Sequence, residues 1–544
     1  MVDRWLCDLT PSVRHPVYTR ANAGEVLPHV ASPLSWSTVW MQGVMPGWRD
    51  SLVNVGTLTA DEVEPEEVVG WFGGRLYINA STSRLFGVRA PGLTAEMIDE
   101  TYFGDHPDVP PYIPEPWHER EESTAQLGAW MAEALVTDLS ELLDDQRQAD
   151  EVRAGRPDLG RLDDQALVDR MRGLLPLVRR LFERHLTVTG GGSVGLGIVG
   201  AVAAALGDPS LTLRLVAAVG DVDSALPSGE MWSLSRLDPS SAEFASGVDR
   251  FVAQYGSRGP NEWDLMSDTW ETDPQLALDL IAVMRKQGDD GDPSVRHDAQ
   301  ATDREAATEQ VRSALAGDAD TLAQFDAGLA SAHRYLAGRE RAKTNIIKVI
   351  HEIRMAGREL AARHARSVEE FHMLLDEELD AFLAAPEGFH ARLSQRLEDY
   401  EALGRLDPPF IVAGTAPPLS DWARVGDAVV APVEAGESLI GMPGCPGSVT
   451  GTARVILDPA DPLALEPGEI LVAPLTDPAW TPLFVPAAGV VVDVGAAVSH
   501  AIIVSRELGI PCVVSATDAT ARIPDGATVT VDGDTGTVTV VALP

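Results

Sequence analysis

The stretch Gly489–Pro511, GVVVDVGAAVSHAIIVSRELGIP, decides how the C-terminal part of the chain folds. Its opening run is β-branched and apolar except for Asp493, which predicts a strand that is covered on both faces. The small residues Gly495-Ala496-Ala497 allow a sharp turn and the close approach of a ligand. A helix is predicted to begin at the N-cap Ser499 and to end at the Gly-Ile-Pro that closes the stretch.

His500 lies in the first turn of this predicted helix. Free backbone N–H groups and the positive end of the helix dipole point toward a group at that position. A neutral imidazole nitrogen placed there is suited to attack a phosphoryl group, whose oxygens the amides receive. The same pattern fits a histidine that is only hydrogen-bonded beside a helix cap, so the residue alone leaves both interpretations open.

The wider segment resembles the phosphohistidine (swivelling) domain of the PEP-utilising enzymes, which include pyruvate phosphate dikinase, PEP synthase, rifampin phosphotransferase and the aryl phosphate synthases. The matching residues are Gly495, Ala496, His500, Ala501, Arg506, Glu507, Gly509, Ile510 and Pro511. Upstream, residues 476–484, TDPAWTPLF, are similar to the TDPxWxPLF segment of the rifampin-type branch. Dikinases usually carry a threonine two residues before the histidine, whereas this chain has Val498. The rifampin-type branch also lacks that threonine. The resemblance implies that His500 carries a phosphoryl group, and the departure points away from a true dikinase.

Composition limits the class of protein. The chain has 544 residues, 45% of them hydrophobic, so about two to four domains are expected. A formal net charge of −40 disfavours nucleic acid and anionic membranes as partners. The three cysteines have neither a disulfide framework nor a metal-binding spacing, the N-terminus lacks a signal-peptide pattern, and no apolar run is expected to span a membrane. We therefore expect a cytoplasmic protein that binds no metal of its own.

The periodicity changes along the chain and predicts a multidomain protein. Residues 1–403 are expected to form a mainly α-helical acceptor-substrate-binding domain, with some strand in an N-terminal arm that extends to about residue 120. A linker rich in Pro, Gly and Ala is predicted at 404–435, and an α/β phosphohistidine swivelling domain at 436–544. The helices predicted in the first domain are 121–148, 164–187, 194–206, 209–219, 242–255, 274–287, 302–335, 337–364, 367–384 and 386–402.

Residues 190–200, GGGSVGLGIVG, contain a GxGxxG pattern. A dinucleotide-binding loop needs a strand before this pattern and an acidic residue downstream. Here a predicted helix precedes the pattern and an alanine-rich helix follows it. We therefore expect a flexible connector between helices or a point of close packing.

Residues 15–40 resemble the segment that opens the acceptor-substrate domain of rifampin phosphotransferase. The matches are Thr19-Arg20-Ala21-Asn22, Gly24-Glu25-Val26, Pro28 and Ser32-Pro33-Leu34. By this resemblance Asn22 and Glu25 are candidates for binding the acceptor. The alternative is that their polar side chains only cap and turn a structured arm.

Residues 255–274, YGSRGPNEWDLMSDTWETDP, resemble the YGxRGPxExD motif of the same domain. Arg258 and Glu262, with Asn261 and Asp264, are candidates for orienting an acceptor hydroxyl or docking the swivelling domain. The alternative is an ion pair between Arg258 and one of the two acidic residues that braces a long loop, whose backbone groups need partners.

Arg339 and Lys343 lie four residues apart on a predicted helix and therefore share one face. Two adjacent cations repel each other, and a phosphoryl group in transfer would supply the anion between them. Rifampin-type enzymes carry a similar RxxxK pair that is implicated in transfer. The alternative is a solvated face on which Glu340 neutralises the charge. His351, further along, is not expected to take part.

The resemblance implies a phosphotransferase subunit. The sequence contains no Walker-type GxxxxGK[ST] motif, and it covers neither the family's ATP-grasp domain nor the C-terminal barrel of dikinases. We expect a separate ATP-grasp subunit to phosphorylate His500 in a dikinase-type reaction, using ATP and Mg²⁺ that the partner binds, and to form a hetero-oligomer with this chain. The histidine domain then delivers the group to an acceptor hydroxyl.

The acceptor is predicted from the split aryl phosphate synthases, phenylphosphate synthase and 4-methylbenzyl phosphate synthase, and from the 12 tryptophans. Both favour a small phenol- or cresol-like alcohol. One alternative is a component of a rifamycin-type antibiotic phosphotransferase. Another is a non-catalytic regulatory or binding module, which a buried His500 with both ring nitrogens hydrogen-bonded would favour.

Overall fold

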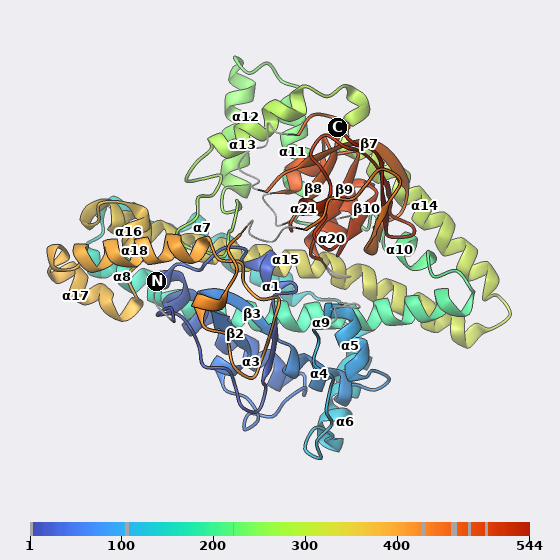
Figure 1. Ribbon diagram of the computed structural model, residues 1–544, viewed down its shortest axis with the longest axis horizontal. Coiled ribbons are helices and arrows are strands. Elements are labelled where there is room, and N and C mark those ends of the chain that lie inside the picture. Colours follow the sequence, from blue (N-terminus) through green and yellow to red (C-terminus); the bar gives the residue numbers. More distant parts are fainter. Residues whose placement is uncertain are drawn as a thin grey trace.

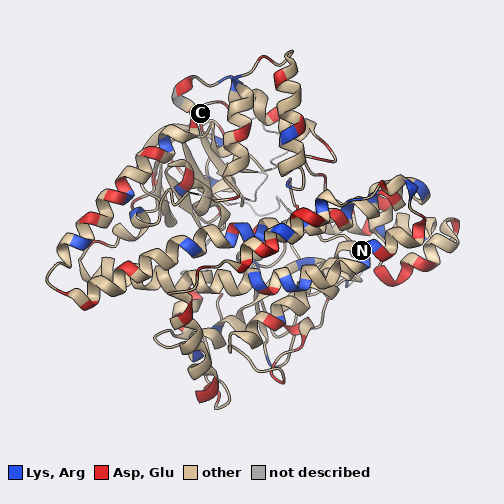
Figure 2. Cartoon of the chain, turned by 180° about the vertical axis from the view of Figure 1, so that it is seen from behind, with Lys and Arg blue, Asp and Glu red and all other residues tan. Residues whose placement is uncertain are grey.

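The computed structural model describes residues 4–103, 108–220, 222–425, 430–457, 465–476, 480–495 and 499–544. It has the predicted multidomain architecture, a mainly helical part followed by an α/β part (Figure 1). The long helix α15 (Ala319–His364) crosses the molecule, with the N-terminal sheet on one side and the C-terminal sheet on the other. Basic residues gather along its central stretch with acidic residues between them (Figure 2).

The helical part is built from many amphipathic helices. Besides α15, the α-helices are α1 (Ala23–Val26), α2 (Pro33–Ser35), α3 (Met45–Asn54), α4 (Ala80–Arg89), α5 (Ala95–Phe103), α6 (Glu121–Ala134), α7 (Glu141–Ala154), α8 (Asp164–Gly173), α9 (Leu175–Ala205), α10 (Leu211–Leu215), α11 (Leu226–Ser235), α12 (Ala242–Tyr255), α13 (Gln275–Arg285), α14 (Pro293–Ala314), α16 (Val368–His372), α17 (Leu379–Ala384) and α18 (His390–Gly404). A π-helix, η1, spans Trp36–Val44, and 3₁₀ turns lie at Pro65–Glu67, Leu159–Arg161, Asp289–Gly291, Asp376–Glu378, Pro386–Gly388 and Leu419–Asp421.

Several predicted helix boundaries were wrong. The predicted helix 121–148 is two helices, α6 and α7, and Leu139 between them has a positive φ of 57°. The predicted helix 302–335 covers the end of α14 and the first part of α15, and α15 then continues without a break through 337–364. The N-cap of α15 is Asp318, whose side chain accepts a hydrogen bond from the Thr321 amide. Local periodicity fixes neither end, because caps and positive-φ residues interrupt helices without changing the apolar pattern.

The glycine-rich segment 190–200 lies inside the continuous helix α9. It is therefore a point of close packing, and the prediction of a flexible connector was wrong. A Cβ atom on Gly195 would lie 2.5 Å from the backbone nitrogen of Ala332 on α15, and one on Gly191 would overlap the ring of Tyr335. The glycines let the backbones of the two longest helices approach closely.

Among the described residues, one stretch, Asp164–Ala205, is long and apolar enough to cross a membrane. This corrects the expectation that no apolar run reaches that length. Its second helix, α9, packs against α15 and α3. A core helix has the same composition, so this stretch is weak support for a membrane span.

The N-terminal sheet has the strand order β2-β3-β1-β4 and is antiparallel where its pairings are described. Its strands are β1 (Val17–Thr19), β2 (Val69–Phe72), β3 (Arg75–Asn79) and β4 (Ile411–Ala413). Strand β4 comes from the predicted linker and pairs with β1, so that Ala413 opposes Val17. The linker is therefore shorter than 404–435, because part of it belongs to the first domain's sheet.

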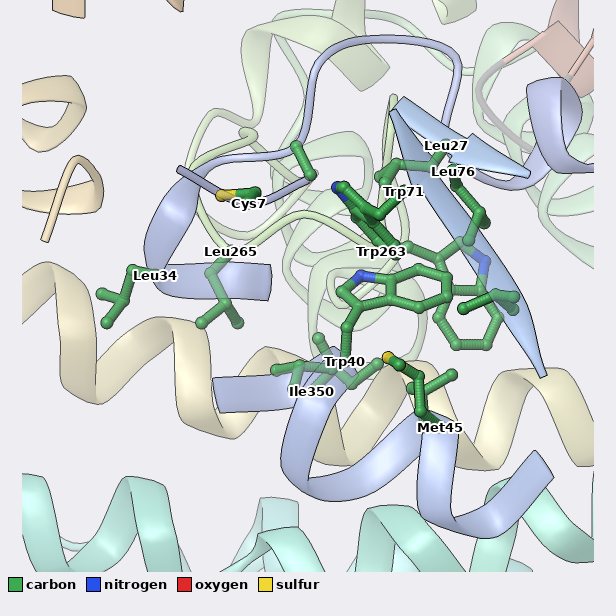
Figure 3. Close-up of a cluster of buried hydrophobic side chains, with 14 of the residues drawn as sticks. Cys7, Leu27, Leu34, Trp40, Met45, Trp71, Leu76, Trp263, Leu265 and Ile350 are labelled. Carbon is green, nitrogen blue, oxygen red and sulfur yellow. The ribbon is translucent and has the colours of Figure 1, made fainter. Parts of the chain in front are cut away.

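The hydrophobic core beneath this sheet contains a group of tryptophans (Figure 3). The ring centroids of Trp40 and Trp71 lie 5.2 Å apart, and those of Trp40 and Trp263 lie 5.9 Å apart. Ile350 of α15 packs in the same cluster. This core fixes α15 against the N-terminal sheet.

Within the described residues, the C-terminal sheet has eight strands in the order β5-β12-β11-β7-β8-β9-β10-β6. These are β5 (Ser438–Ile440), β6 (Met442–Cys445), β7 (Ser448–Val455), β8 (Ile470–Ala473), β9 (Gly489–Val492), β10 (Cys512–Val514), β11 (Thr528–Asp532) and β12 (Thr537–Ala542). Strands β7 to β10 pair in parallel, and the remaining pairs are antiparallel. Short helices α19 (Thr481–Phe484) and α21 (Ala519–Arg522) accompany them.

Helix α20 (His500–Leu508) connects the parallel strands β9 and β10. Ile502, Val504 and Leu508 are buried in the core beneath the sheet. Gly509 ends the helix with a left-handed φ of 64°, a conformation that favours glycine. The predicted strand and helix are both present, and the turn residues 496–498 lie outside the described part of the chain.

Candidate active site

His500 is the first residue of α20 and faces the helical domain. Its backbone N–H donates a hydrogen bond to Oε2 of Glu25 on α1, at 3.3 Å. Only 6% of the residue is exposed. Two segments that are far apart in the sequence therefore meet at the N-terminal end of the helix that carries the histidine.

Both ring nitrogens of His500 have hydroxyl partners. Nε2 lies 2.9 Å from Oγ1 of Thr481, and Nδ1 lies 3.2 Å from Oγ1 of Thr476. A hydroxyl group can donate or accept, so each partner fits either tautomer. Burial, together with the positive charge of Lys343, holds the pKa of His500 well below its usual value. The ring is therefore neutral at physiological pH, which is the nucleophilic form.

Ser499 occupies the predicted N-cap position in an extended conformation, but its side chain accepts no hydrogen bond from the helix. The carboxylate of Glu25 is the acceptor at this helix start instead. Burial raises the pKa of Glu25 to about 7, although the hydrogen bond from His500 and the charges of Arg339 and Lys343 oppose the shift. Near neutral pH this carboxyl group is thus poised to take up or release a proton.

Arg339 and Lys343 on α15 lie near both His500 and Glu25, and their positive charges act to lower the pKa of each of these groups. Their side chains are 18% and 14% exposed, so they do not form the solvated face of the alternative interpretation. Within the described part of the chain, Nε and Nη1 of Arg339 are buried without a hydrogen-bond partner, although Nη1 lies 3.4 Å from Oε1 of Glu340. Burial alone would raise the pKa of Glu340, but Arg339 and Lys343 lower it to about 2. The guanidinium group therefore retains unused donors for an anion.

Arg258 and Glu262 form the bracing ion pair that was one of the two predicted alternatives. Nε of Arg258 donates to Oε2 of Glu262 at 2.7 Å, and both side chains are buried. Arg258 also donates to Oγ1 of Thr344 on α15. Glu262 lies 3.5 Å from Nζ of Lys343, so this loop helps to hold the lysine in place.

Asn22 positions the short helix that carries Glu25. It is the N-cap residue of α1 with a φ of 55°, and its carbonyl oxygen accepts from the Glu25 amide at 3.1 Å. Its Oδ1 atom is buried with no hydrogen-bond partner among the residues that the structure describes. Binding of the acceptor by Asn22 stays a prediction.

Sequence reasoning missed three residues near this centre. Thr476 and Thr481 stood in the TDPAWTPLF segment, whose spacing matched a known motif but assigned no role to the hydroxyls. Glu340 was treated only as a neutralising charge. The predicted motif residues 477–479, together with Ala496 and Val498 of the turn, lie outside the described residues.

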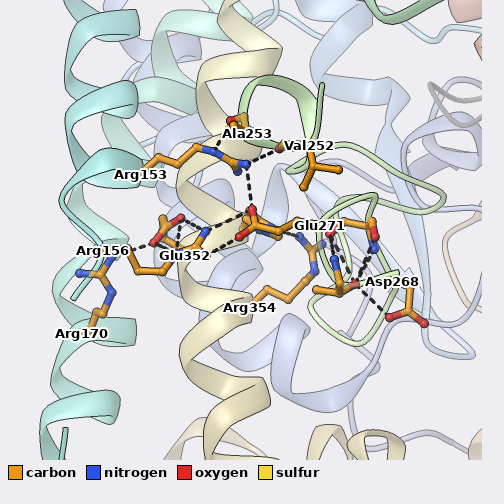
Figure 4. Close-up of polar contacts among 12 residues, drawn as sticks. Arg153, Arg156, Arg170, Val252, Ala253, Asp268, Glu271, Glu352 and Arg354 are labelled. Atoms are coloured by element: carbon orange, nitrogen blue, oxygen red, sulfur yellow. Dashed lines mark hydrogen bonds and ion pairs between the residues drawn. The ribbon is translucent and has the colours of Figure 1, made fainter. Parts of the chain in front are cut away.

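A second buried polar cluster braces the helical domain without reaching His500 (Figure 4). Glu352 of α15 accepts hydrogen bonds from Arg156 and Arg170, and Nε2 of His351 lies 3.0 Å from Oε2 of Glu271. Burial lowers the pKa of His351 to about 4. His351 is a neutral core histidine, and its contacts join α15 to the 255–274 loop.

Comparison with known proteins identifies two matching regions in this chain. The family model described as PEP-utilising enzyme, mobile domain, matches residues 465–536, which include His500 and both threonines. The C-terminal part of the chain is thus similar to the mobile domain of the PEP-utilising enzymes. The model described as rifampicin phosphotransferase fourth domain matches residues 185–340. This second match ends within the α15 stretch that carries Arg339.

Similar proteins include a rifampicin phosphotransferase of Streptomyces sviceus, which is 30% identical over 317 residues, 56% of this chain and 35% of that protein. The prodigiosin synthesizing transferase PigC of Serratia marcescens is 31% identical over 319 residues, 57% of this chain and 35% of that protein. An uncharacterized protein of Mycobacterium tuberculosis is 31% identical over 352 residues, 63% of this chain and 35% of that protein. The chain spans about a third of the length of these relatives.

Proposed function

We propose that this protein is a phosphotransferase subunit in which His500 carries a phosphoryl group to an acceptor hydroxyl. The observation that carries the proposal is the hydrogen bond between the His500 amide and Glu25, with Arg339 and Lys343 beside it. A neutral nucleophilic ring, a carboxyl group and two cations are the groups that phosphoryl transfer requires. They come from two domains, which fits a carrier docked at its point of delivery.

Loading of His500 requires a different arrangement. With 6% of the residue exposed, an ATP-binding protein has no access to the ring in this docked state. The histidine domain must first move away from Glu25 so that a ring nitrogen can attack the donor phosphorus. An N–P bond then forms and the P–O bond to the donor's leaving group breaks. By family resemblance the overall donor reaction converts ATP and water to AMP and free phosphate, and the remaining phosphoryl group stays on His500.

Delivery takes place in the docked state. The acceptor oxygen attacks phosphorus, the N–P bond breaks, and the imidazole returns to its neutral form. Glu25 takes the proton of the hydroxyl group, for which a pKa of about 7 is suitable. Arg339 and Lys343 neutralise the charge of the transferring oxygens.

The donor in this proposal is a separate ATP-grasp subunit that binds ATP and Mg²⁺ and associates with this chain in the cytoplasm. This part of the proposal is supported by the resemblance to the two-subunit aryl phosphate synthases. The three cysteines are free and buried, which is compatible with a reducing compartment. In this proposal the present chain accepts the phosphoryl group on His500, and the partner subunit binds the nucleotide.

The acceptor in this proposal is a small phenol-like alcohol, by resemblance to the split aryl phosphate synthases. The tryptophan content supports it less than the sequence implied, because most tryptophans serve packing. Eight of the twelve are buried: Trp5, Trp40, Trp71, Trp232, Trp263, Trp270, Trp422 and Trp480. A rifamycin-type acceptor is the second candidate, and the match of residues 185–340 to a rifampicin phosphotransferase domain favours it.

A non-catalytic module is the third candidate. The burial of His500 and the hydrogen bonds to both ring nitrogens favour it. The positions of Arg339 and Lys343 oppose it, because both cations act on the histidine instead of pointing to solvent. Phosphorylation of His500 decides between a carrier and a structural histidine.

The test is to purify the chain from its native host with any ATP-grasp protein that accompanies it, and to add ATP and Mg²⁺. We expect the intact mass to rise by one phosphoryl group that is labile to acid, and H500A to abolish the gain. The matched control is H364A, at the C-terminal end of α15. Phenol, p-cresol and rifampicin are then offered as acceptors. A mass that never rises under any loading condition would refute the proposal.

A further inference from the structure

The loop that follows α10 receives the C-terminal end of α20. The amides of Val219 and Gly220 donate to Oε1 and Oε2 of Glu507, at 3.0 and 3.2 Å. The amide of Ala218 donates to the carbonyl oxygen of Arg506 at 3.2 Å. Three successive N–H groups of the helical domain therefore point at the end of the helix that begins with His500.

The helical domain itself holds this loop in shape. Ala218 has a positive φ of 44° and Gly220 one of 77°, and backbone of this kind turns successive N–H groups toward one anion. Arg304 of α14 donates to the carbonyl oxygens of Ala217 and Ala218. The loop therefore has supports that do not depend on Glu507.

A side chain completes the contact from a second direction. Nε2 of His297 on α14 lies 3.6 Å from Oε2 of Glu507. Nearby, Nη2 of Arg296 donates to the carbonyl oxygen of Val485 at 2.7 Å. Helix α14 therefore contacts the histidine domain through both Arg296 and His297. Glu507 is only 5% exposed in this arrangement.

The position of Glu507 within its own helix makes the contact informative. It lies in the last turn of α20, where the negative end of the helix dipole disfavours a carboxylate. Its hydrogen-bonding partners at the carboxylate belong to the other domain. The helix dipole does not explain an acidic residue at position 507, whereas the contact with the amides of the other domain does.

We infer that loop 218–220 and His297 form a carboxylate receptor, and that Glu507 is the docking residue that positions His500 for delivery. Glu507 and His500 lie seven residues apart on one helix, which is about 10 Å of rigid rod. When the carboxylate of Glu507 is bound by the loop, the rigid helix therefore fixes the position of His500 relative to Glu25. This inference rests on the proposed function for its purpose, but the contact itself is testable without it.

A change at Glu507 is expected to affect the two half-reactions, loading and delivery, differently. Loading takes place with the histidine domain undocked, so the change E507Q leaves its rate unaltered. Delivery requires the receptor to be filled, so the same change slows discharge by about tenfold, the effect of losing one charge-assisted hydrogen bond. E466Q is the matched control, because Glu466 forms an exposed ion pair with Lys286 across the same interface.

The experiment measures hydrogen exchange of the peptide that covers residues 216–220, in the full chain without partner or acceptor. We expect protection in the wild type, at least a tenfold loss in E507Q, and no change in E466Q. H297A approaches the contact from the other domain and is expected to weaken protection as well, which covers the case that E507Q does not fold. Equal protection in the wild type and in every folded variant would overturn the inference.

Discharge of the loaded protein onto phenol is then followed in the same variants. A tenfold slower discharge of E507Q with unchanged loading supports the positioning role, and equal discharge refutes it. If the wild type never accepts a phosphoryl group but E507Q still loses protection at residues 216–220, the proposed function fails and the docking contact stands.

Discussion

The carboxylate of Glu25 accepts a hydrogen bond from the backbone amide of His500, at 3.3 Å, although 475 residues separate the two in the sequence. A carboxyl group at the start of a helix interacts favourably with the helix dipole. Here the helix and the carboxyl group belong to different domains. The contact therefore ties the proposed chemistry to the docked position of the histidine domain.

Replacing Glu25 tests its role in proton transfer. We expect E25Q to lower the rate of discharge by about 10²–10⁴-fold, the usual effect of losing a general base, and to leave loading of His500 unchanged. Single-turnover transfer from the phosphorylated protein measures both steps. E66Q, at an exposed site, is the control. Equal losses in loading and discharge would instead point to a structural role.

The pH dependence of discharge follows from the same carboxyl group. The base is active when deprotonated, and burial raises the pKa of Glu25 to about 7. The rate is therefore expected to rise with pH up to about 7 and then to level off. In E25Q this rise is expected to disappear, and a rise that persists would assign the base to another group.

The cation pair is tested by R339M and K343M. Each change removes a donor from the transferring phosphoryl oxygens, and we expect discharge to fall by about 10²–10³-fold. K348M is the control on the same helix, because Lys348 pairs with Asp150 and does not face His500 in the described contacts. Discharge that falls as much in K348M would show a general effect of charge on α15.

The two threonines are expected to orient the ring of His500. T481V and T476V each remove one hydroxyl partner, and we expect the rate of phosphorylation to fall by up to about tenfold, with rescue by the serine variants. ³¹P NMR of the loaded protein shows which ring nitrogen carries the group. A rate and a site of phosphorylation that are unchanged in both valine variants would contradict an orienting role.

Docking through Glu507 is expected to weaken as pH rises. The nearby carboxylate of Glu507 raises the pKa of His297 in the docked state. The protonated ring therefore favours docking fully at pH values below the usual pKa of histidine. That contribution is lost as pH rises through the raised pKa. The other charged groups here are Asp298 beside His297, and Arg506 and His333 near Glu507. Protection factors of residues 216–220, corrected for intrinsic exchange, measure the change, and H297Q is expected to remove it.

Helix packing is tested with two glycines on α9. G195A places a methyl group against the backbone of α15, and we expect the free energy of unfolding to fall by about 1–3 kcal/mol. G197A meets no atom within 4 Å and removes a flexible residue from a helix, so a gain of about 0.5–1 kcal/mol is expected. Thermal melting compares the two. A gain in both variants would show that close approach at Gly195 is not required.

The local elements around His500 follow from short-range features of the amino-acid sequence. An apolar β-branched run, small turn residues and the Gly-Ile-Pro stop are short-range signals, and the strand β9 and the helix α20 follow from them. The four-residue spacing of Arg339 and Lys343 likewise placed both cations on one face of a helix, because helical geometry is local. No short-range signal predicts that Glu25 lies close to His500, because the local sequence pattern of one segment contains no information about its contacts with the other.

The way in which these elements pack together is seen only in the folded chain. The single helix α15, the closeness of Gly195 to Ala332, the pairing of β4 with β1 and the seat of Glu507 in loop 218–220 all depend on contacts between distant segments. Such contacts are selected by burial and by the need to pair every buried polar group, which a single sequence read in local windows does not display. The order of the residues therefore predicted most groups of the candidate site, but it did not predict how they come together.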